Sequence, residues 1–346
     1  MHLVLSDEMD APHLRAEVER AVPGARVENS GPGLLAVHGL STESTLRTPL
    51  VFARQLLLDA TFESATSIRA WAELLFNRVS AVVTGTGPWR LHVTPRYGQG
   101  SAGANRCGLI RQTLLEELGR RRRSLKRSLH AEPSLFRPDE SFVQLLLTSP
   151  ETGFLSILTA PRPYELRHRI AGDPMGEIPL ASDKSAPSRA FAKLVEAERR
   201  LGVPITADDF CVDLGASPGS WSYVALQRGA RVTAVDRSPL RDDLMVNPRL
   251  TFVRGDAFRF EPDRRADWLL CDVIAAPERN MGLVLEWLRR GLCRRFVVSI
   301  KFKGADDYRK LDQLKEELPG LTESFLLTRL CANRNEACAA GTARAP

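Results

Sequence analysis

The clearest hydrophobic pattern lies in the second half of the chain, where short apolar runs alternate with longer segments of helical spacing. The apolar runs are Phe210 to Leu214, Arg231 to Val235, Leu250 to Val253, Trp268 to Cys271, Arg295 to Ile300 and Ser324 to Leu330. The helical segments are Trp221 to Arg228, Pro277 to Gly291 and Ala305 to Leu318. Strands that alternate with helices in this way predict a doubly wound, mainly parallel α/β sheet. If the last two segments pair across Cys331 to Asn335, one edge of that sheet is antiparallel.

The first half has weaker patterns, which predict two smaller α/β units followed by a linker. Residues 1–47 contain two strand-like pieces and a helix, and residues 48–160 contain two helices, a strand and a hairpin. The pieces are His2 to Leu5, Pro12 to Ala21 and Leu34 to His38, then Ser67 to Val79, Arg90 to Pro95, Leu109 to Leu118, Phe142 to Leu147 and Phe154 to Leu158. A Pro- and Gly-rich linker is predicted at 161–179, and a catalytic domain at 180–346, whose first helix starts at Ser185 by its capping residue and early proline.

Composition narrows the class of protein. No stretch of 18 consecutive apolar residues occurs, and the N-terminus lacks a signal-like segment, so a cytoplasmic location is expected. The six cysteines include no C-x-x-C pair and several fall in predicted strands. They are therefore expected to be reduced structural thiols, and no metal site is expected.

The positive charge of the chain is concentrated in one segment. Residues 106–137 hold nine Arg or Lys and three Glu, an excess that equals the net charge of +6 for the whole chain. Such a run is either a solvated surface or a phosphate-contacting one. The candidate RNA contacts are Arg120, Arg121, Arg122, Arg123, Lys126 and Arg127. In the linker, Arg162, Arg167, His168 and Arg169 are placed to reach a polyanion.

The sequence Asp213-Leu-Gly-Ala-Ser-Pro-Gly-Ser-Trp221 reads as a strand, a tight turn and a helix N-terminus, a common ligand site of open parallel sheets. Its glycine spacing is not the G-x-G-x-x-G of dinucleotide sites, and the carboxylate of Asp213 would repel phosphate. A cationic ligand without phosphate, S-adenosylmethionine, fits better; an ordinary turn with a capping Asp is the alternative. The candidate cofactor residues are Asp213, Gly215, Ser217, Pro218, Gly219, Trp221, Asp236, Asp256 and Asp272, with Asp236 placed to accept ribose hydroxyls.

Asp272 and Lys301 also fall at strand ends, where the functional groups of such sheets gather. The residues after Asp272 lack the Pro-Pro-aromatic sequence of exocyclic-amine methyltransferases. Cys271 follows Leu270 and not the proline that cytosine-C5 enzymes require. A carboxylate facing a lysine suits a hydroxyl acceptor, which must lose its proton as it attacks a methyl group.

Together with Ser299-Ile-Lys301 and Lys193, these motifs resemble the FtsJ-like 2′-O-ribose methyltransferases. With a THUMP-like unit ahead and Pro187-Ser-Arg-Ala-Phe-Ala-Lys-Leu-Val-Glu-Ala197, the chain most resembles the RlmM family of bacterial 23S rRNA cytidine 2′-O-ribose methyltransferases, over roughly residues 162–336. The resemblance implies a catalytic tetrad of Lys193, Asp272, Lys301 and Glu336, S-adenosylmethionine as cofactor and ribosomal RNA as partner.

The chain departs from this family at two places. Ser220 stands where family members commonly have Gly, and Glu336-Ala-Cys-Ala-Ala-Gly is poor in the β-branched residues expected of a strand. Three alternatives to the ribosomal RNA enzyme stay open: an RNA-binding protein with a degenerate methyltransferase domain, a 2′-O-methyltransferase of another RNA such as tRNA, and a small-molecule O-methyltransferase. It is also open whether Lys301 abstracts the hydroxyl proton or orients the hydroxyl.

Overall fold

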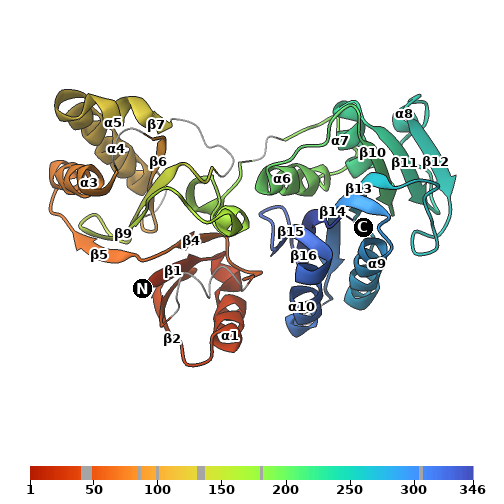
Figure 1. Cartoon of the computed structure of the whole chain (residues 1–346), viewed down its shortest axis with the longest axis horizontal. Helices are drawn as coiled ribbons and strands as arrows, with labels where there is room; N and C mark the ends of the chain where they lie inside the picture. Colours follow the sequence, from red (N-terminus) through yellow and green to blue (C-terminus); the bar gives the residue numbers. More distant parts are fainter. Residues whose placement is uncertain are drawn as a thin grey trace. The chain divides into compact units, whose positions relative to one another are not determined.

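The computed structural model describes residues 1–39, 49–83, 87–98, 101–130, 137–179, 182–303 and 307–345. The chain forms two compact units, Met1–Glu177 and Ile178–Pro346, and Figure 1 labels the elements of each. The division falls close to the end of the predicted linker.

The first unit begins with a four-stranded antiparallel sheet of order β2-β3-β1-β4. Its elements are β1 (His2–Leu5), η1 (Glu8–Asp10), α1 (Ala11–Ala21), β2 (Arg26–Gly31), β3 (Leu34–His38) and β4 (Gln55–Leu57). The predicted helix and both predicted strands are present. The three-residue β4 lies beyond residue 47 yet pairs with β1, so the small N-terminal sheet draws on a later stretch of chain than the sequence predicts.

A second sheet of the first unit has the strand order β5-β9-β8-β6-β7. Its elements are β5 (Thr61–Ser64), α3 (Ile68–Val82), β6 (Trp89–Pro95), α4 (Ala102–Arg121), α5 (Arg123–Ser128), β7 (Leu129–His130), β8 (Ser141–Leu147) and β9 (Thr152–Leu158). The antiparallel pairing of β8 with β9 is the predicted hairpin. Buried residues such as Trp71, Ile110 and Val143 form its core between α3, α4 and the strands.

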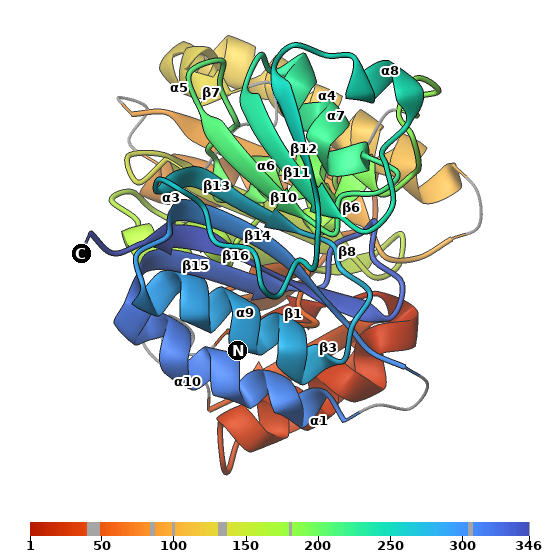
Figure 2. The same ribbon diagram turned by 90° about the vertical axis from the view of Figure 1, so that its right-hand side faces the viewer.

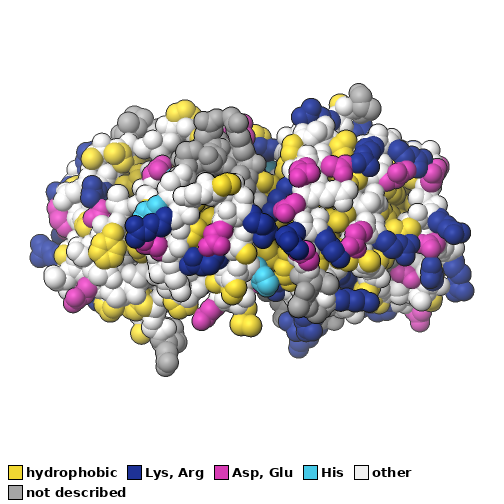
Figure 3. Space-filling view, turned by 90° about the horizontal axis from the view of Figure 1, so that it is seen from below, with side chains coloured by type: hydrophobic (Ala, Val, Ile, Leu, Met, Phe, Trp, Pro, Cys, Tyr) yellow, Lys and Arg dark blue, Asp and Glu magenta, His cyan; other side chains and the backbone are white. Residues whose placement is uncertain are grey.

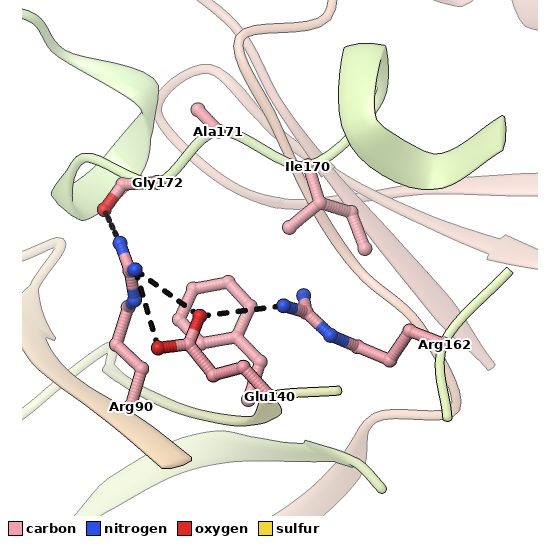
Figure 4. Close-up of a pocket in the computed structure, with 7 residues that line it drawn as sticks. Arg90, Glu140, Arg162, Ile170, Ala171 and Gly172 are labelled. Atoms are coloured by element: carbon pink, nitrogen blue, oxygen red, sulfur yellow. Dashed lines mark hydrogen bonds and ion pairs between the residues drawn. The ribbon is translucent and has the colours of Figure 1, made fainter. Parts of the chain in front are cut away.

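The segment predicted as a linker packs against the first unit. It contains two short 3-10 helices, η2 (Tyr164–His168) and η3 (Pro174–Gly176). Glu140 forms ion pairs with Arg90 at 3.1 Å and with Arg162 at 3.4 Å. Arg90 also donates a hydrogen bond to the carbonyl of Gly172 at 2.9 Å (Figure 4). Arg162 is only 5% exposed, and burial lowers its pKa to about 10. The expectation that Arg162 reaches a polyanion is therefore wrong, because its guanidinium is used inside the unit.

The second unit is built on a seven-stranded sheet of order β12-β11-β10-β13-β14-β16-β15. Its strands are β10 (Phe210–Leu214), β11 (Arg231–Asp236), β12 (Leu250–Arg254), β13 (Ala266–Cys271), β14 (Cys293–Lys301), β15 (Thr322–Thr328) and β16 (Glu336–Ala343). β10 to β14 pair in parallel, and β16 lies antiparallel between β14 and β15. This is the predicted doubly wound sheet with an antiparallel edge.

Helices cover both faces of this sheet (Figures 1 and 2). Its helices are α6 (Phe191–Leu201), α7 (Ser220–Gln227), α8 (Asp242–Met245), α9 (Pro277–Arg289), η4 (Tyr308–Leu311) and α10 (Asp312–Leu321). Leu194 and Trp221, from α6 and α7, join one buried cluster with the strands, whereas α9 and α10 pack together over β14 and β15.

The last strand forms despite its small residues, which the sequence reads as poor strand material. β16 is a central strand and is buried along most of its length. A Cβ atom at Gly341 would lie 2.4 Å from the carbonyl oxygen of Ser324 and 3.1 Å from the ring of Phe296. Close packing from a neighbouring strand therefore selects small side chains here, and tertiary contacts override the strand propensity.

Two predicted helix starts differ from the structure. The helix expected from Ser185 begins at Phe191. The hydroxyl of Ser188 accepts from the backbone of Ala190 and pairs with the hydroxyl of Ser220 at 2.7 Å, so the cap-like residues stabilise a turn. The helix expected from Ala305 begins at Asp312 after η4, and residues 304–306 lie outside the described part of the chain.

The surface and the cysteines follow ordinary patterns. On the face shown in Figure 3, basic and acidic side chains are interspersed over both units. All six cysteines are free thiols, and five are buried. Among the residues that the structure describes, none of the helices combines the length and the apolar character that crossing a membrane would need.

Candidate active site

Four ionisable side chains predicted for the site fall at the carboxyl ends of parallel strands. Asp213 is in β10, Asp236 ends β11, Asp272 follows β13 and Lys301 ends β14. Because these strands run in parallel, their carboxyl ends share one edge of the sheet, where ligands of open α/β sheets bind. Glu336 joins them from the antiparallel β16, since it pairs directly with Lys301 in the register.

The four predicted tetrad residues meet at this edge. Lys193 Nζ lies 3.2 Å from Asp272 Oδ1 and 2.8 Å from Glu336 Oε2. Lys301 Nζ lies 3.1 Å from Asp272 Oδ1. Lys193 comes from α6, so one helix, two parallel strand ends and one antiparallel strand each contribute a side chain. Two cations and two carboxylates thus form one connected network.

The two lysines of the network have different surroundings. The Lys193 side chain is 10% exposed and donates to both carboxylates, at 3.2 and 3.3 Å to Asp272 and 2.8 Å to Glu336. Burial by itself lowers the pKa of Lys193, but the charge of Asp272 and the hydrogen bond and charge of Glu336 outweigh it, so the pKa is raised. Lys193 is therefore held as an ammonium ion near neutral pH.

Lys301 is the more accessible lysine, with a side chain 21% exposed. Its Nζ contacts the carboxylate of Asp272 and donates to the main-chain carbonyl of the same residue at 2.7 Å. An ammonium group has three donors. These two contacts leave one donor direction of Lys301 for a substrate atom, whereas Lys193 is enclosed by its carboxylates.

The predicted glycine turn has the backbone geometry that requires glycine. Gly215 and Gly219 have φ of +71° and +108°, in the left-handed region that other residues rarely adopt. A Cβ at Gly215 would also lie 2.3 Å from a methyl group of Val273, and one at Gly219 would lie 2.4 Å from Leu244. The turn therefore lies close against its neighbours, and α7 starts directly after it.

Asp236 is held in a fixed orientation beside that turn. Its Oδ2 accepts from the backbone N–H of Ser217 at 3.1 Å, and its Oδ1 accepts from the N–H of Ser238 at 2.9 Å. Each carboxylate oxygen can accept more than one hydrogen bond, so both keep capacity for a ligand hydroxyl. This geometry fits a ribose diol. The backbone of Pro218, in the same turn, accepts from the N–H of Arg241 at 3.1 Å.

Two predicted cofactor residues direct their side chains into the protein. Asp213 is 1% exposed and accepts from the hydroxyl of Ser222 at 2.7 Å; burial raises its pKa to about 7, although the Ser222 hydrogen bond acts in the opposite direction. The indole N–H of Trp221 donates to the carbonyl of Ala190 at 2.9 Å inside the core. The structure therefore gives both side chains a packing role and supplies no open anion at Asp213.

Asp256, the last predicted cofactor residue, lies after β12. Its carboxylate accepts from the backbone N–H of Phe258 at 3.0 Å and from Arg237 at 2.8 Å. The Phe258 hydrogen bond, followed by that of Arg237, lowers the pKa of Asp256. Asp256 is thus a carboxylate in a fixed orientation. It follows β12, the strand that pairs with β11, and β11 ends in Asp236.

The basic run ends α4 and forms α5 in the first unit. Arg121 pairs with Glu73 at 2.9 Å and stacks on the ring of Phe76 at 3.8 Å, and Arg120 contacts Glu117 at 3.3 Å. Arg120, Arg121, Arg123, Lys126 and Arg127 are exposed, and Arg122 is partly exposed. The run is a solvent-facing basic surface, with Arg121 the member most tied to its neighbours.

Sequence reasoning missed two polar contacts beside the site. The hydroxyl of Ser220, the residue that departs from the family pattern, pairs with Ser188 and so fastens the segment before α6 to the start of α7. Asn280, on the buried face of α9, reaches the ends of β13 and β14. Neither contact has a local sequence signal. Ser188 and Ser220 are distant in the sequence, and Asn280 lies on the buried face of a helix.

Comparison with known protein families supports the resemblance that the sequence motifs indicate. Residues 186–302 match the family described as FtsJ-like methyltransferase. The predicted resemblance is confirmed for this segment. It contains three of the four tetrad residues, Lys193, Asp272 and Lys301, together with the glycine turn.

Curated relatives agree with this match. The chain is 37% identical over 176 residues to "Ribosomal RNA large subunit methyltransferase M" of Pseudomonas syringae pv. syringae (strain B728a), covering 47% of this chain and 49% of that protein. It is 36% identical over 157 residues to the protein of the same name from Azoarcus sp. (strain BH72), covering 44% and 43%. The matches thus span less than half the length of these relatives. The solved structure of TrmN from Thermus thermophilus is 15% identical over 99% of both chains, with a TM-score of 0.33.

Proposed function

We propose that the chain is an S-adenosylmethionine-dependent RNA 2′-O-ribose methyltransferase. The observation that carries the proposal is the contact network of Lys193, Asp272, Lys301 and Glu336 at the carboxyl edge of the sheet. These side chains come from four separate elements, and a domain that had lost its chemistry would not need them to meet. The network thus favours an enzyme over the degenerate RNA-binding protein.

The turn and the strand ends fit the proposed cofactor. Gly215 and Gly219 keep the backbone close and free of side chains, and the oriented carboxylate of Asp236 suits the ribose hydroxyls. Ser217 and Pro218 shape the same turn, and Asp256 lies at the next strand end. When bound, S-adenosylmethionine would supply an electrophilic methyl group. Asp213 contributes by joining β10 to α7 through Ser222.

The acceptor side follows from the difference between the two lysines. Lys301 has the remaining donor and the greater exposure, so in this proposal it holds the ribose 2′-oxygen in line with the methyl carbon. Asp272 fixes Lys301 through two contacts, and Lys193 with Glu336 fixes Asp272 from the other side. As the 2′-oxygen bonds to the methyl carbon, the bond between that carbon and the donor sulfur would break to leave S-adenosylhomocysteine, and the hydroxyl proton would pass to solvent. Orientation is thus the main contribution of Lys301, because its two contacts with Asp272 fix the direction of its remaining donor.

We further propose that ribosomal RNA is the substrate, with a cytidine as the target, and that the protein works in the cytoplasm. The names of the curated relatives support the choice of ribosomal RNA over tRNA. In the first unit, the basic side chains of the run 120–127 would contact RNA phosphates in a THUMP-like domain. A small-molecule acceptor would leave this basic surface without a role.

The test is methyl transfer from labelled S-adenosylmethionine to ribosomal RNA of cells that lack the gene. A 2′-O-methyl group blocks alkaline cleavage of the neighbouring phosphodiester, because the 2′-oxygen is the nucleophile of that cleavage. Alkaline digestion should therefore leave a labelled dinucleotide, and mass spectrometry should identify its 5′ nucleoside as cytidine. Label in alkali-labile mononucleotides would contradict ribose methylation, and transfer to tRNA alone would contradict the substrate.

A further inference from the structure

Asn280 connects the two strand ends that carry Asp272 and Lys301. It lies in α9, is fully buried, and donates from its side-chain amide to the carbonyl of Val273 at 3.0 Å and to the carbonyl of Ser299 at 2.9 Å. Val273 directly follows Asp272, and Ser299 precedes Lys301 by two residues. One amide group therefore spans both strand ends.

The position of these bonds matters because the two strands stop pairing there. The backbone register of β13 with β14 ends at Cys271 and Val298, just before the catalytic positions. Beyond that point β14 still pairs with β16 but no longer with β13, and the carbonyls of Val273 and Ser299 both accept from Asn280. The amide thus continues the connection between β13 and β14 at the level of Asp272.

Packing alone does not explain an amide at this place. Asn280 is 0% exposed, and its Oδ1 is a buried acceptor without a hydrogen-bond partner among the described residues. An unsatisfied buried acceptor is a cost that an apolar side chain of the same size would not incur. Its neighbours on the buried face of α9, such as Val284 and Leu288, are apolar.

We propose that Asn280 is a positioning residue, which fixes the distance between Asp272 and Lys301 and thereby the orientation of the acceptor hydroxyl. The inference rests on the proposed function. Without the amide, the two strand ends would separate or slide, and the donor of Lys301 would no longer point along one direction. A misplacement of about 1 Å can reduce a rate by about a hundredfold.

The test compares Asn280→Leu with Val284→Ala, which changes a buried residue of the same helix one turn further on whose side chain has no hydrogen-bonding group. Both should lower the melting temperature. Only Asn280→Leu should lower the single-turnover rate of methyl transfer, by about ten- to a hundredfold, while the affinities for S-adenosylmethionine and RNA change by less than about threefold. Equal rates in the two variants would overturn the proposal. If Asn280→Leu does not fold, Asn280→Ala removes the same two bonds without crowding and is judged by the same result.

A second measurement is independent of activity. The Lys301 ammonium resonance in a proton–nitrogen correlation spectrum, assigned by its loss in Lys301→Ala, reports the contacts of that group with Asp272. It should shift or broaden in Asn280→Leu and stay in place in Val284→Ala. If the wild-type chain methylates no RNA ribose, the proposed function fails, and this resonance alone decides the role of Asn280. An unchanged resonance in Asn280→Leu would overturn that role.

Discussion

Lys301 contacts Asp272 twice, through the carboxylate at 3.1 Å and through the main-chain carbonyl at 2.7 Å. The two contacts set the direction of the ammonium group more firmly than a single ion pair would. Because Asp272 is held in turn by Lys193 at 3.2 Å, the orientation of Lys301 depends on a lysine from a separate helix. We therefore expect the loss of the Lys301 side chain to reduce the rate of methyl transfer and to leave the binding affinities nearly unchanged.

Lys301→Ala should reduce methyl transfer by about two to four powers of ten, the usual range for a positioned acid–base group. The affinities for S-adenosylmethionine and RNA should stay within a few fold, because the interaction acts mainly in the transition state. Lys301→Arg should not restore the rate, since a planar guanidinium does not reproduce the directed contact of an amine. Single-turnover kinetics with calorimetric binding would check this. A near-normal rate in Lys301→Ala would refute the assignment.

Glu336→Gln keeps the size of the side chain and removes its charge. Glu336 supports the raised pKa of Lys193 through a hydrogen bond and its charge, so the variant should lower that pKa and loosen Asp272. We expect the rate to fall by about tenfold, less than for a group that contacts the hydroxyl. Glu323→Gln, an exposed carboxylate on β15, is the matched control. Equal rates in the two variants would place Glu336 outside the chemistry.

The sequence predicts the elements of the second unit well because its strands are short apolar runs that end in a polar residue. Asp236, Asp272 and Lys301 lie at strand ends as expected, since the carboxyl ends of parallel strands share one edge. β16 shows the limit of the approach. Its alanines and Gly341 have weak strand propensity, and only the neighbouring strand explains them. Propensity cannot reveal a central strand that tertiary packing selects.

Burial is the second property that a local pattern does not give. The sequence suggests that Arg162 is an unpaired cation in a loop. In the structure it pairs, inside the first unit, with Glu140, which lies more than twenty positions away in the sequence. Asp213 reads as an open carboxylate, yet its side chain turns toward Ser222 in the core. In both cases the sequence gives the residue type and its position along the chain. The direction of the side chain depends on contacts with residues elsewhere in the sequence.

Asp236→Ala should weaken the binding of S-adenosylmethionine, because it removes the carboxylate that suits the ribose diol. The loss of a hydrogen-bonded charged partner typically costs about 1.5 to 3 kcal/mol, or roughly ten- to a hundredfold in affinity. Titration calorimetry measures it directly. Asp242→Ala, an exposed carboxylate in α8, serves as the control and should bind normally. Equal affinity in both variants would mean that the donor site is misplaced.

Replacing Arg120, Arg122 and Arg123 by alanine should weaken RNA binding and flatten the dependence of log Kd on log salt. Each lost contact with a single-strand phosphate should change the slope by up to about 0.7, because fewer counterions are released. Arg121 is left in place, since its contacts with Glu73 and Phe76 give it a structural role. Filter binding at several salt concentrations provides the slope. If neither affinity nor slope changes, the run is only a solvated surface.

Asp213→Asn should change how stability depends on pH. Burial raises the pKa of this carboxyl to about 7 in the folded chain, whereas an unfolded aspartate titrates near pH 4. Between about pH 4 and 7 the native state keeps a proton that the unfolded state has lost, so the free energy of unfolding falls as the pH rises and levels off above about 7. The stabilisation is present in full below about pH 4, and its decline is of order 1 kcal/mol per pH unit.

Asparagine cannot titrate, so the variant should lack this decline. The difference in unfolding free energy, wild type minus Asp213→Asn, should therefore decrease from pH 5 to pH 7 and stay constant from pH 7.5 to pH 9. Urea unfolding of both proteins at each pH gives the difference, and groups that titrate equally in both cancel from it. Parallel profiles would show that Asp213 stays ionised in the folded chain, and the carboxylate would then be an anion beside the glycine turn, as its charge in the sequence first suggests.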